Sequence, residues 1–237
     1  MGVQQVGIPS LRSATALFGG GKWFAEAESG EIGNLSRRIS FAAHSRIFTE
    51  SEPSTTVCML THGTAGLYKM LADGRRQIVG FALPGDFLGS LFSDRHTCSV
   101  DAISEVAARQ FRRGPFLAFL RAHPKSPYLM LEAALQQNNA AHDHMLLLGC
   151  GTAEEKFSDF IINWRARAGR RGALSNLVLL PMSRRDIADY LGLRIETVSR
   201  VIARLERENV VRVISEGLQL MGSTERPLLI ERCFRIA

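Results

Sequence analysis

The sequence contains no apolar run approaching the ~18 residues that a membrane-spanning helix requires, so we expect no membrane span. It also lacks an N-terminal basic segment followed by a long apolar one, which argues against a secretory signal. The two absences predict a cytoplasmic protein. Its 237 residues, 46% of them hydrophobic, are enough for one large domain or two small ones with hydrophobic cores.

Cysteine is also scarce. The four cysteines are far apart, at positions 58, 98, 150 and 233. No two form a CxxC motif, and none precedes Cys58. In a reducing compartment such cysteines are expected to be free thiols. An iron–sulfur cluster held by N-terminal cysteines is not expected.

Motifs of catalysis are absent as well. We find no nucleophile elbow, Walker loop, HExxH or carboxylate pair, so we expect no enzyme activity and no catalytic residue. His96 and Cys98 could point the same way on a strand, but no third ligand is close in sequence, and we read them as a surface-turn histidine and a half-buried cysteine. His142 and His144 lie about 200° apart around a helix and cannot chelate together. We therefore expect no metal and no cofactor.

The positive charge is unevenly distributed. The chain carries a net charge of +6 and has a pI of about 9.5. Between Arg165 and Arg212 there are eleven arginines, no lysine and five acidic residues, which gives this part alone the full excess of +6. Because the rigid guanidinium group suits phosphate contacts, this concentration indicates a polyanionic partner.

The first half of the chain divides into an arm and a strand-rich segment. Residues 1–44 show little pattern, and we assign them to an N-terminal arm. Residues 45–123 contain many short alternating segments. Asp73-Gly74 between two of them, 67–71 and 77–81, is a strong hairpin signal. Short strands at regular spacing predict a small antiparallel β-roll.

We assign residues 124–152 to a dimerisation segment, with one long helix over 124–149. Apolar and polar residues recur there at alternating spacings of three and four, which is a heptad seam. The seam includes Leu131, Leu135, Asn138, His142 and Met145. Polar residues within a seam are typical of a two-stranded coiled coil with a fixed register, so we expect a homodimer. The alternative is simple packing of this helix on the roll.

The remaining residues, 153–237, begin with a predicted helix whose stripe of large apolar side chains we read as core. Ser183 and Asp186 then have the spacing of a capping box, and Gly192 suits the end of the helix that follows. A second helix reaches Asn209, and a short hairpin over 210–220 completes a winged helix-turn-helix.

The second helix of this unit has two different sides. Around its circumference Val198, Val201, Ile202 and Leu205 cluster on one side, while the opposite side carries Glu196, Ser199, Arg200 and Ala203. A short polar face with one guanidinium and one carboxylate is what a helix needs to read bases in the major groove. The pattern alone also fits an ordinary surface helix with a Glu196–Arg200 pair.

A family resemblance favours DNA reading. Residues 191–200, Leu-Gly-Leu-Arg-Ile-Glu-Thr-Val-Ser-Arg, resemble the recognition-helix signature of the cyclic-AMP-receptor/fumarate-nitrate-reduction (Crp/Fnr) regulator superfamily. The core of this signature is most similar to the Fnr/FixK branch, and the resemblance extends from about Arg46 to Leu220. Without N-terminal cysteines, the chain resembles a FixK-type regulator. The resemblance implies an α+β fold: a cyclic-nucleotide-binding-like β-roll, a long dimerisation helix and a C-terminal winged helix-turn-helix.

The resemblance also implies roles in DNA binding. Arg200 is expected to read guanine and Glu196 the amino group of cytosine or adenine, with Ser199 beside them and Ile195 on a thymine methyl group. Contacts to the DNA backbone are expected from five residues: Ser183, Arg184, Arg185, Arg194 and Thr197. Arg194 stands where a capping Ser or Thr is usual, so we expect a weakened helix start in the free protein.

The segment 84–89, Pro-Gly-Asp-Phe-Leu-Gly, resembles the start of the family's nucleotide-binding cassette, but the residues that follow depart from it. Ser90 stands where cyclic-AMP binders carry Glu, and His96 where they carry Arg, with Arg95 beside it. A neutral imidazole binds a phosphate much less well than a guanidinium. We therefore expect activity without an obligatory effector. The alternative is the same fold gated by an unrecognised small ligand or haem.

The resemblance implies a homodimeric transcription regulator, most simply an activator that also contacts RNA polymerase. Two recognition helices would enter successive major grooves of a palindromic, TTGA-type site. Genes for microaerobic respiration, nitrogen fixation or denitrification are the expected targets.

Overall fold

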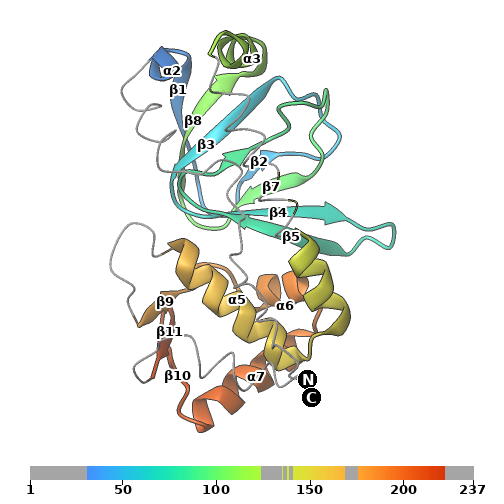
Figure 1. Cartoon of the computed structure of the whole chain (residues 1–237), viewed down its shortest axis with the longest axis vertical. Helices are drawn as coiled ribbons and strands as arrows, with labels where there is room; N and C mark the ends of the chain where they lie inside the picture. Colours follow the sequence, from blue (N-terminus) through green and yellow to red (C-terminus); the bar gives the residue numbers. More distant parts are fainter. Residues whose placement is uncertain (1–30, 124–134, 136–137, 139–140, 169–175, 222–237) are drawn as a thin grey trace, which may run out of the picture.

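The computed structural model describes residues 31–123, 135, 138, 141–168 and 176–221 (Figure 1). Along its longest axis, a strand-rich part lies at one end and a mostly helical part at the other. The predicted α+β architecture is confirmed. Within the described ranges, no helix combines the length and the apolar character needed to cross a membrane.

The strand-rich part is a roll of two four-stranded antiparallel sheets. One sheet has the order β1-β8-β3-β6, formed by Ser36–Phe41, Val106–Arg112, Thr56–His62 and Phe87–Leu88. The other has the order β2-β7-β4-β5, formed by Arg46–Phe48, Ser99–Ala102, Ala65–Met70 and Arg76–Ala82. Two helices, α2 at Glu31–Asn34 and α3 at Arg113–Ala122, lie at the far end. Small and branched apolar residues fill the interior, among them Leu60, Leu88, Val100 and Val106.

The β4–β5 hairpin forms where the sequence predicted it. Gly74 adopts a left-handed conformation with φ of 80°, and the Leu71 N–H donates to the Arg75 carbonyl at 2.8 Å. Both features close the turn between β4 and β5. The hairpin extends away from the roll and over the helical part of the molecule (Figure 1).

Strand β1 corrects the assignment of residues 1–44 to an arm. It pairs with β8 over its whole length, from Ser36 opposite Phe111 to Phe41 opposite Val106. Ile39 and Phe41 pack against the core of the roll, whereas Arg37 and Arg38 are exposed. The alternation covers only two apolar positions, which follow two arginines, and so short a pattern is a weak strand signal.

The helical part contains α5 at Ala153–Ala168, α6 at Arg184–Leu191 and α7 at Ile195–Arg207. Three short strands form a small sheet of order β10-β11-β9, at Val211–Ile214, Gly217–Leu220 and Leu177–Leu179. The predicted hairpin after the second helix is present as β10 and β11, and β9 pairs with β11. These elements are the winged helix-turn-helix.

The helical segment 141–150 lies beside this unit and contacts it through one of its two sides. The His144 ring stacks on the Tyr190 ring of α6, with centroids 4.3 Å apart. The Lys156 ammonium donates to the Leu148 carbonyl at 2.9 Å. The segment is therefore joined to both α5 and α6.

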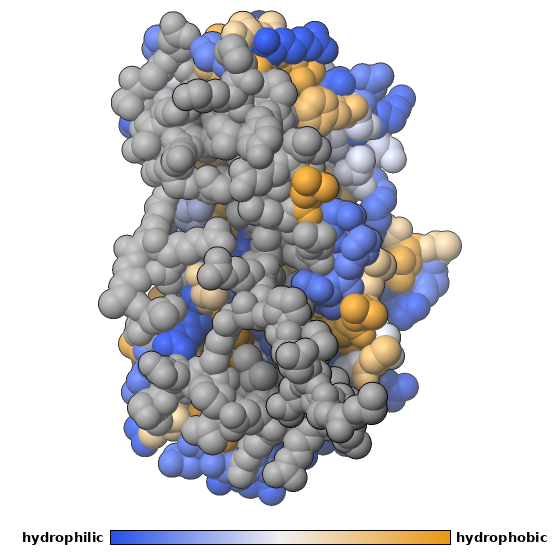
Figure 2. Space-filling model, viewed as in Figure 1, coloured by the Kyte–Doolittle hydropathy of each residue, from blue (hydrophilic) through white to orange (hydrophobic). Residues whose placement is uncertain are grey.

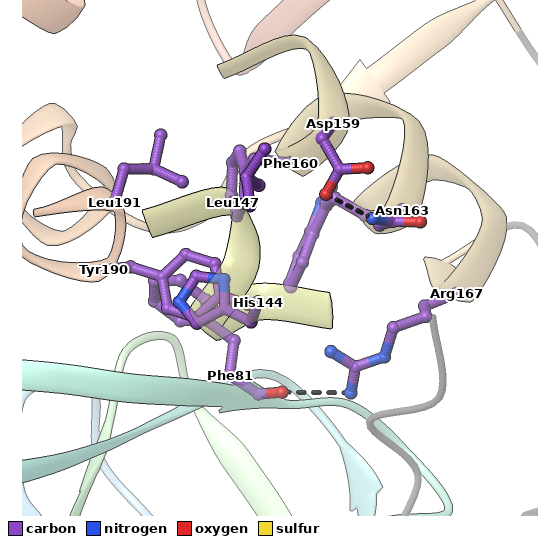
Figure 3. A pocket seen from close by; sticks show the side chains of 10 residues that line it. Phe81, His144, Leu147, Asp159, Phe160, Asn163, Arg167, Tyr190 and Leu191 are labelled. Carbon is purple, nitrogen blue, oxygen red and sulfur yellow. Dashed lines mark hydrogen bonds between the residues drawn. The ribbon is translucent and has the colours of Figure 1, made fainter. Parts of the chain in front are cut away.

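One hydrophobic core connects the roll and the winged helix-turn-helix. Phe81 of β5 packs against three rings of the helical part: Tyr190, Trp164 and Phe160, at centroid distances of 5.4, 5.9 and 6.0 Å (Figure 3). Tyr68 and Ile78 of the hairpin belong to the same buried cluster as Ile187, Val198 and Ile202 of the helix-turn-helix. The two parts are thus packed together as one unit.

Asp159 of α5 lines a small hollow at this junction (Figure 3). Burial raises the pKa of its carboxyl group to about 6. The hydrogen bond that Asn163 donates to the carboxylate at 2.7 Å lowers this pKa, and the negative charge of Asp143 raises it. Between pH 3.8 and about 6 the folded protein therefore binds more protons than the unfolded chain. Stability contributed by the neutral carboxyl group is lost as the pH rises through this window.

We predict that Asp159→Asn stabilises the protein at neutral and alkaline pH. The amide stays uncharged and can still accept from Asn163, so the variant should unfold with a free energy about 1–2 kcal/mol larger at pH 8, a value discounted for partial solvent exposure. The gain should disappear near pH 4. Denaturant titrations at pH 4 and pH 8 measure the difference in unfolding free energy. If the variant and the wild type were equally stable at pH 8, Asp159 would not be destabilised by the burial of its charge.

Candidate nucleic-acid interface

Helix α6 begins with a complete capping box. The Asp186 N–H donates to the Ser183 Oγ at 3.1 Å, and the Ser183 N–H donates to the Asp186 carboxylate at 3.0 Å. Gly192 ends the helix in the left-handed conformation, with φ of 61°. Both features follow the sequence prediction, and they fix the angle between α6 and the helix that follows.

The start of α6 presents cations to solvent. Ser183, Arg184 and Arg185 are all exposed, so a phosphate group can reach them. The Asp186 carboxylate already occupies the positive end of the helix and accepts from the Ser183 hydroxyl at 2.7 Å. The two arginine side chains are therefore better placed than the serine hydroxyl to hold a DNA phosphate.

Helix α7 buries one side and exposes the other. Val198, Ile202 and Leu205 are at most 5% exposed and lie in the shared core. On the opposite side Glu196, Arg200 and Ala203 are exposed, and Ser199 is half-buried between them. The helix lies at the end of the molecule farthest from the roll, and the coloured residues visible along that end in Figure 2 are mainly hydrophilic. The polar side chains of this face are thus accessible to solvent.

The two charged residues of this face do not neutralise each other. Among the residues that the structure describes, neither Glu196 nor Arg200 forms an ion pair. Arg200 makes one weak contact, donating from Nη2 to the Thr197 Oγ1 at 3.3 Å. The alternative of an ordinary surface helix held by a Glu196–Arg200 pair is therefore not what the structure shows.

The other arginines of α7 have different positions. Arg204 is paired with Glu208 and with Glu154 of α5, each at 3.0 Å, so it joins α7 to α5. Arg207 lies in the last turn and donates to the Ala203 carbonyl at 3.4 Å. Arg200 is thus the arginine of α7 that lies on the exposed face next to Glu196.

Three further predicted DNA contacts lie near the start of α7. Arg194 occupies the N-cap position with an extended backbone, and its side chain makes no capping hydrogen bond. The Thr197 N–H donates to the Arg194 carbonyl at 2.9 Å. Ile195 is half-buried and packs against the shared core, which leaves only part of its side chain for a thymine methyl group.

The cassette-like turn of the roll offers no inward-pointing cation. His96 is only 5% exposed, because its ring packs at a tilt against Phe48, with centroids 4.3 Å apart, and its Nδ1 accepts from the Ser90 N–H at 3.4 Å. The expectation of a surface-turn histidine was therefore wrong, whereas Cys98 is half-buried as expected. Burial lowers the pKa of His96, which keeps its imidazole neutral. Arg95 turns outward and donates to the Ser51 carbonyl at 2.6 Å.

No metal site is found among the described residues, where no three of the His, Cys, Asp and Glu side chains come together. Of the cysteines there, Cys58 is buried and Cys150 exposed, and all three are free. Burial raises the pKa of the Cys58 thiol to about 12, so it stays protonated and unreactive.

The predicted dimer seam is exposed wherever the structure describes it. Leu135 and Met145 are 56% and 60% exposed, and Asn138 and His142 are exposed as well. Leu131 lies outside the described residues. The opposite side of the segment, with His144, faces α6 instead. Large apolar side chains in solvent are what a seam would show in a single protomer.

Sequence reasoning missed the residues that join the two parts. Arg167 pairs with Asp86 at 2.8 Å, and Arg76 pairs with Asp186. Asp86 drew attention only as part of the cassette-like turn, and Arg167 only as one of many arginines. A contact between residues 81 positions apart leaves no periodic signal in a single sequence.

Comparisons with known proteins agree with this geometry. The family model described as "Cyclic nucleotide-binding domain" matches residues 38–123, and the one described as "Bacterial regulatory proteins, crp family" matches residues 180–211. The nitrogen fixation regulation protein FixK of Bradyrhizobium diazoefficiens is 46% identical over 82% of both chains. The transcriptional activatory protein AadR of Rhodopseudomonas palustris is 43% identical, also over 82% of both.

Solved structures lead to the same family. The structure of FixK2 from Bradyrhizobium japonicum superposes with a TM-score of 0.75 and 32% identity, and the match covers 83% of this chain and 96% of that one. A mutant of CooA from Carboxydothermus hydrogenoformans has a TM-score of 0.71 at 14% identity, which supports the fold alone. On these grounds, the chain belongs to the Crp/Fnr family of bacterial transcription regulators, as a member of the FixK type.

Proposed function

We propose that this regulator binds a palindromic TTGA-type site as a homodimer, without an obligatory small-molecule effector. The observation that carries the proposal is the exposed face of α7, where Glu196 and Arg200 are both accessible and form no ion pair among the described residues. Arg200 would donate two hydrogen bonds to a guanine, and Glu196 would accept from the amino group of cytosine or adenine. Ser199 and Ile195 would contact neighbouring bases, the latter through the part of its side chain that is exposed.

The backbone contacts of the complex would come from two helix starts. Arg184 and Arg185 are exposed at the start of α6. Arg194 and Thr197 lie at the start of α7, where the Arg194 side chain makes no capping hydrogen bond. Cations at these two places would hold phosphates on either side of one major groove and so fix the register of the reading face.

The homodimer is supported by four exposed seam residues: Leu135, Asn138, His142 and Met145. Regulators of this family bind DNA and act as dimers. In a dimer formed through the seam, two copies of α7 would enter major grooves about one helical turn, roughly 34 Å, apart. A two-fold symmetric protein requires a palindromic site.

Effector independence is supported by the cassette-like turn. Its imidazole is buried against Phe48 and hydrogen-bonded to the backbone of Ser90, and Arg95 is engaged with Ser51 on the outside. A cyclic phosphate would find a neutral ring where it needs a cation. The gated alternative, with an unrecognised ligand or haem, would need a different site.

The names of the relatives suggest the genes. FixK is named for the regulation of nitrogen fixation and AadR as a transcriptional activatory protein. By similarity we propose an activator that contacts RNA polymerase at genes for nitrogen fixation, microaerobic respiration or denitrification.

We predict that Arg200→Ala weakens binding to a TTGA palindrome at least about tenfold, because a bidentate arginine–guanine pair contributes roughly 1–3 kcal/mol in each half-site. Binding to a scrambled duplex should change little. Fluorescence anisotropy of both labelled duplexes measures the ratio. Arg207→Ala is the matched control: it removes the same charge from the same helix, and any loss should be equal for both duplexes. Equal losses for Arg200→Ala would show that Arg200 does not read a base.

We predict that Leu135→Glu raises the dimer dissociation constant about tenfold or more, because it places two carboxylates in the seam. Sedimentation velocity at a series of protein concentrations measures the equilibrium. Val79→Glu is the control, since Val79 is 46% exposed on β5 and outside the seam. An unchanged dissociation constant in the Leu135 variant would show that the interface lies elsewhere.

We predict that cyclic AMP and cyclic GMP at millimolar concentration leave both the melting temperature and the affinity for the palindrome unchanged. The purified protein should also show no Soret band. An increase in affinity with either nucleotide would refute effector independence and restore the gated alternative.

A further inference from the structure

A buried ion pair joins the roll to the winged helix-turn-helix. The Arg167 Nη2, in the last turn of α5, lies 2.8 Å from the Asp86 Oδ2, and the two side chains are only 10% and 7% exposed. The same nitrogen donates to the Phe81 carbonyl of β5 at 3.0 Å (Figure 3). Arg167 therefore binds two points of the roll at once.

Asp86 is itself held in place by the roll. Its carboxylate accepts from the Leu83 N–H at 2.9 Å, and its carbonyl accepts from the Leu60 N–H at 2.9 Å. The carboxylate cannot follow Arg167 if the helical part moves. The pair thus ties the end of α5 to a fixed position on the turn that leads to Ser90.

A second group of contacts holds α6 at the other end of β5. Arg76 pairs with Asp186 and lies 3.6 Å from the carboxylate of Asp189. The neighbouring Gln77 donates to the Asp189 carbonyl. Between the two ends, Phe81 packs into the aromatic cluster of Phe160, Trp164 and Tyr190. The orientation of the helix-turn-helix is fixed along the length of β5.

Stability alone is a poor explanation for a buried ion pair. Removing two charges from water costs about as much as their attraction returns, and apolar replacements are often equally stable. Such a pair can instead favour one geometry, because both charges are satisfied only when the two side chains meet at hydrogen-bonding distance. The position selected here leaves the reading face of α7 open.

We propose that Asp86 and Arg167 are positioning residues for DNA binding: the pair holds the winged helix-turn-helix in the orientation that reads DNA when no effector is bound. This inference rests on the proposed effector-independent binding. In this proposal the cassette-like turn holds the DNA-binding part in place, because its Asp86 binds Arg167.

The test compares Asp86→Asn, Arg167→Met and the double variant, all in the full-length protein. Each single variant leaves one buried charge unpaired, so both should lose thermal stability and bind the palindrome about tenfold more weakly. The double variant removes both charges, so its melting temperature should return close to that of the wild type. Its affinity for the palindrome should nevertheless stay about tenfold weaker, because the orientation is no longer selected.

Two further variants complete the set. Arg167→Lys keeps the positive charge, but its shorter side chain does not carry the nitrogen as far as the Arg167 Nη2 that contacts both Asp86 and the Phe81 carbonyl, so it should recover only part of the affinity. Asp73→Asn is the matched control. Asp73 also pairs with an arginine, Arg75 at 2.7 Å, but it is exposed and its contacts lie within the β4–β5 turn. It should bind like the wild type. Affinities are corrected for the active fraction by stoichiometric titration.

A double variant that is stable and binds the palindrome as tightly as the wild type would overturn the positioning role, while effector-independent binding would stand. If the wild type itself prefers the palindrome no more than a scrambled duplex, the proposed function fails. Even then the positioning role is testable: if the Asp86 and Arg167 variants bind either duplex as tightly as the wild type or more tightly, the pair does not favour DNA binding.

Discussion

The packing of Phe81 against Phe160, Trp164 and Tyr190 is the interaction on which the rest of the structure depends. It merges the core of the DNA-binding part with that of the roll, and its rings bury area from both. The ion pairs of Arg76 and Arg167 act at the two ends of this contact and specify its geometry. Apolar burial supplies the attraction between the parts, and the charges select one arrangement among those that burial would permit.

The contact also explains why α6 can be short. An eight-residue helix is marginal by itself, and α6 is stabilised by its capping box, by the left-handed Gly192 and by burial of Ile187, Ala188 and Leu191. Asp186 serves twice, once as the carboxylate that completes the capping box with Ser183 and once as the partner of Arg76. The same side chain therefore sets the start of the helix and its position on β5, and through α6 it positions the reading face of α7.

Sequence reasoning was most successful where the signals are local. The cap at Ser183, the turn at Gly74 and the two-sided pattern of α7 each arise within a few residues, and the structure confirms them. It was wrong about β1, whose alternation is too short, and about His96, whose burial depends on Phe48 in a distant strand. The joint between the two parts could not be predicted, because pairs such as Asp86 with Arg167 are formed only by the tertiary fold. The base contacts of α7 remain predictions.

The missing cap at Arg194 has a thermodynamic consequence for recognition. Arg194 offers no side-chain acceptor to the first N–H groups of α7, so the start of this helix lacks the roughly 1 kcal/mol that a Ser or Thr cap would contribute. A DNA phosphate bound beside it would accept hydrogen bonds from these N–H groups and so supply the missing cap only in the complex. Association should accordingly release more heat, and lose more conformational entropy, than the docking of an already capped helix.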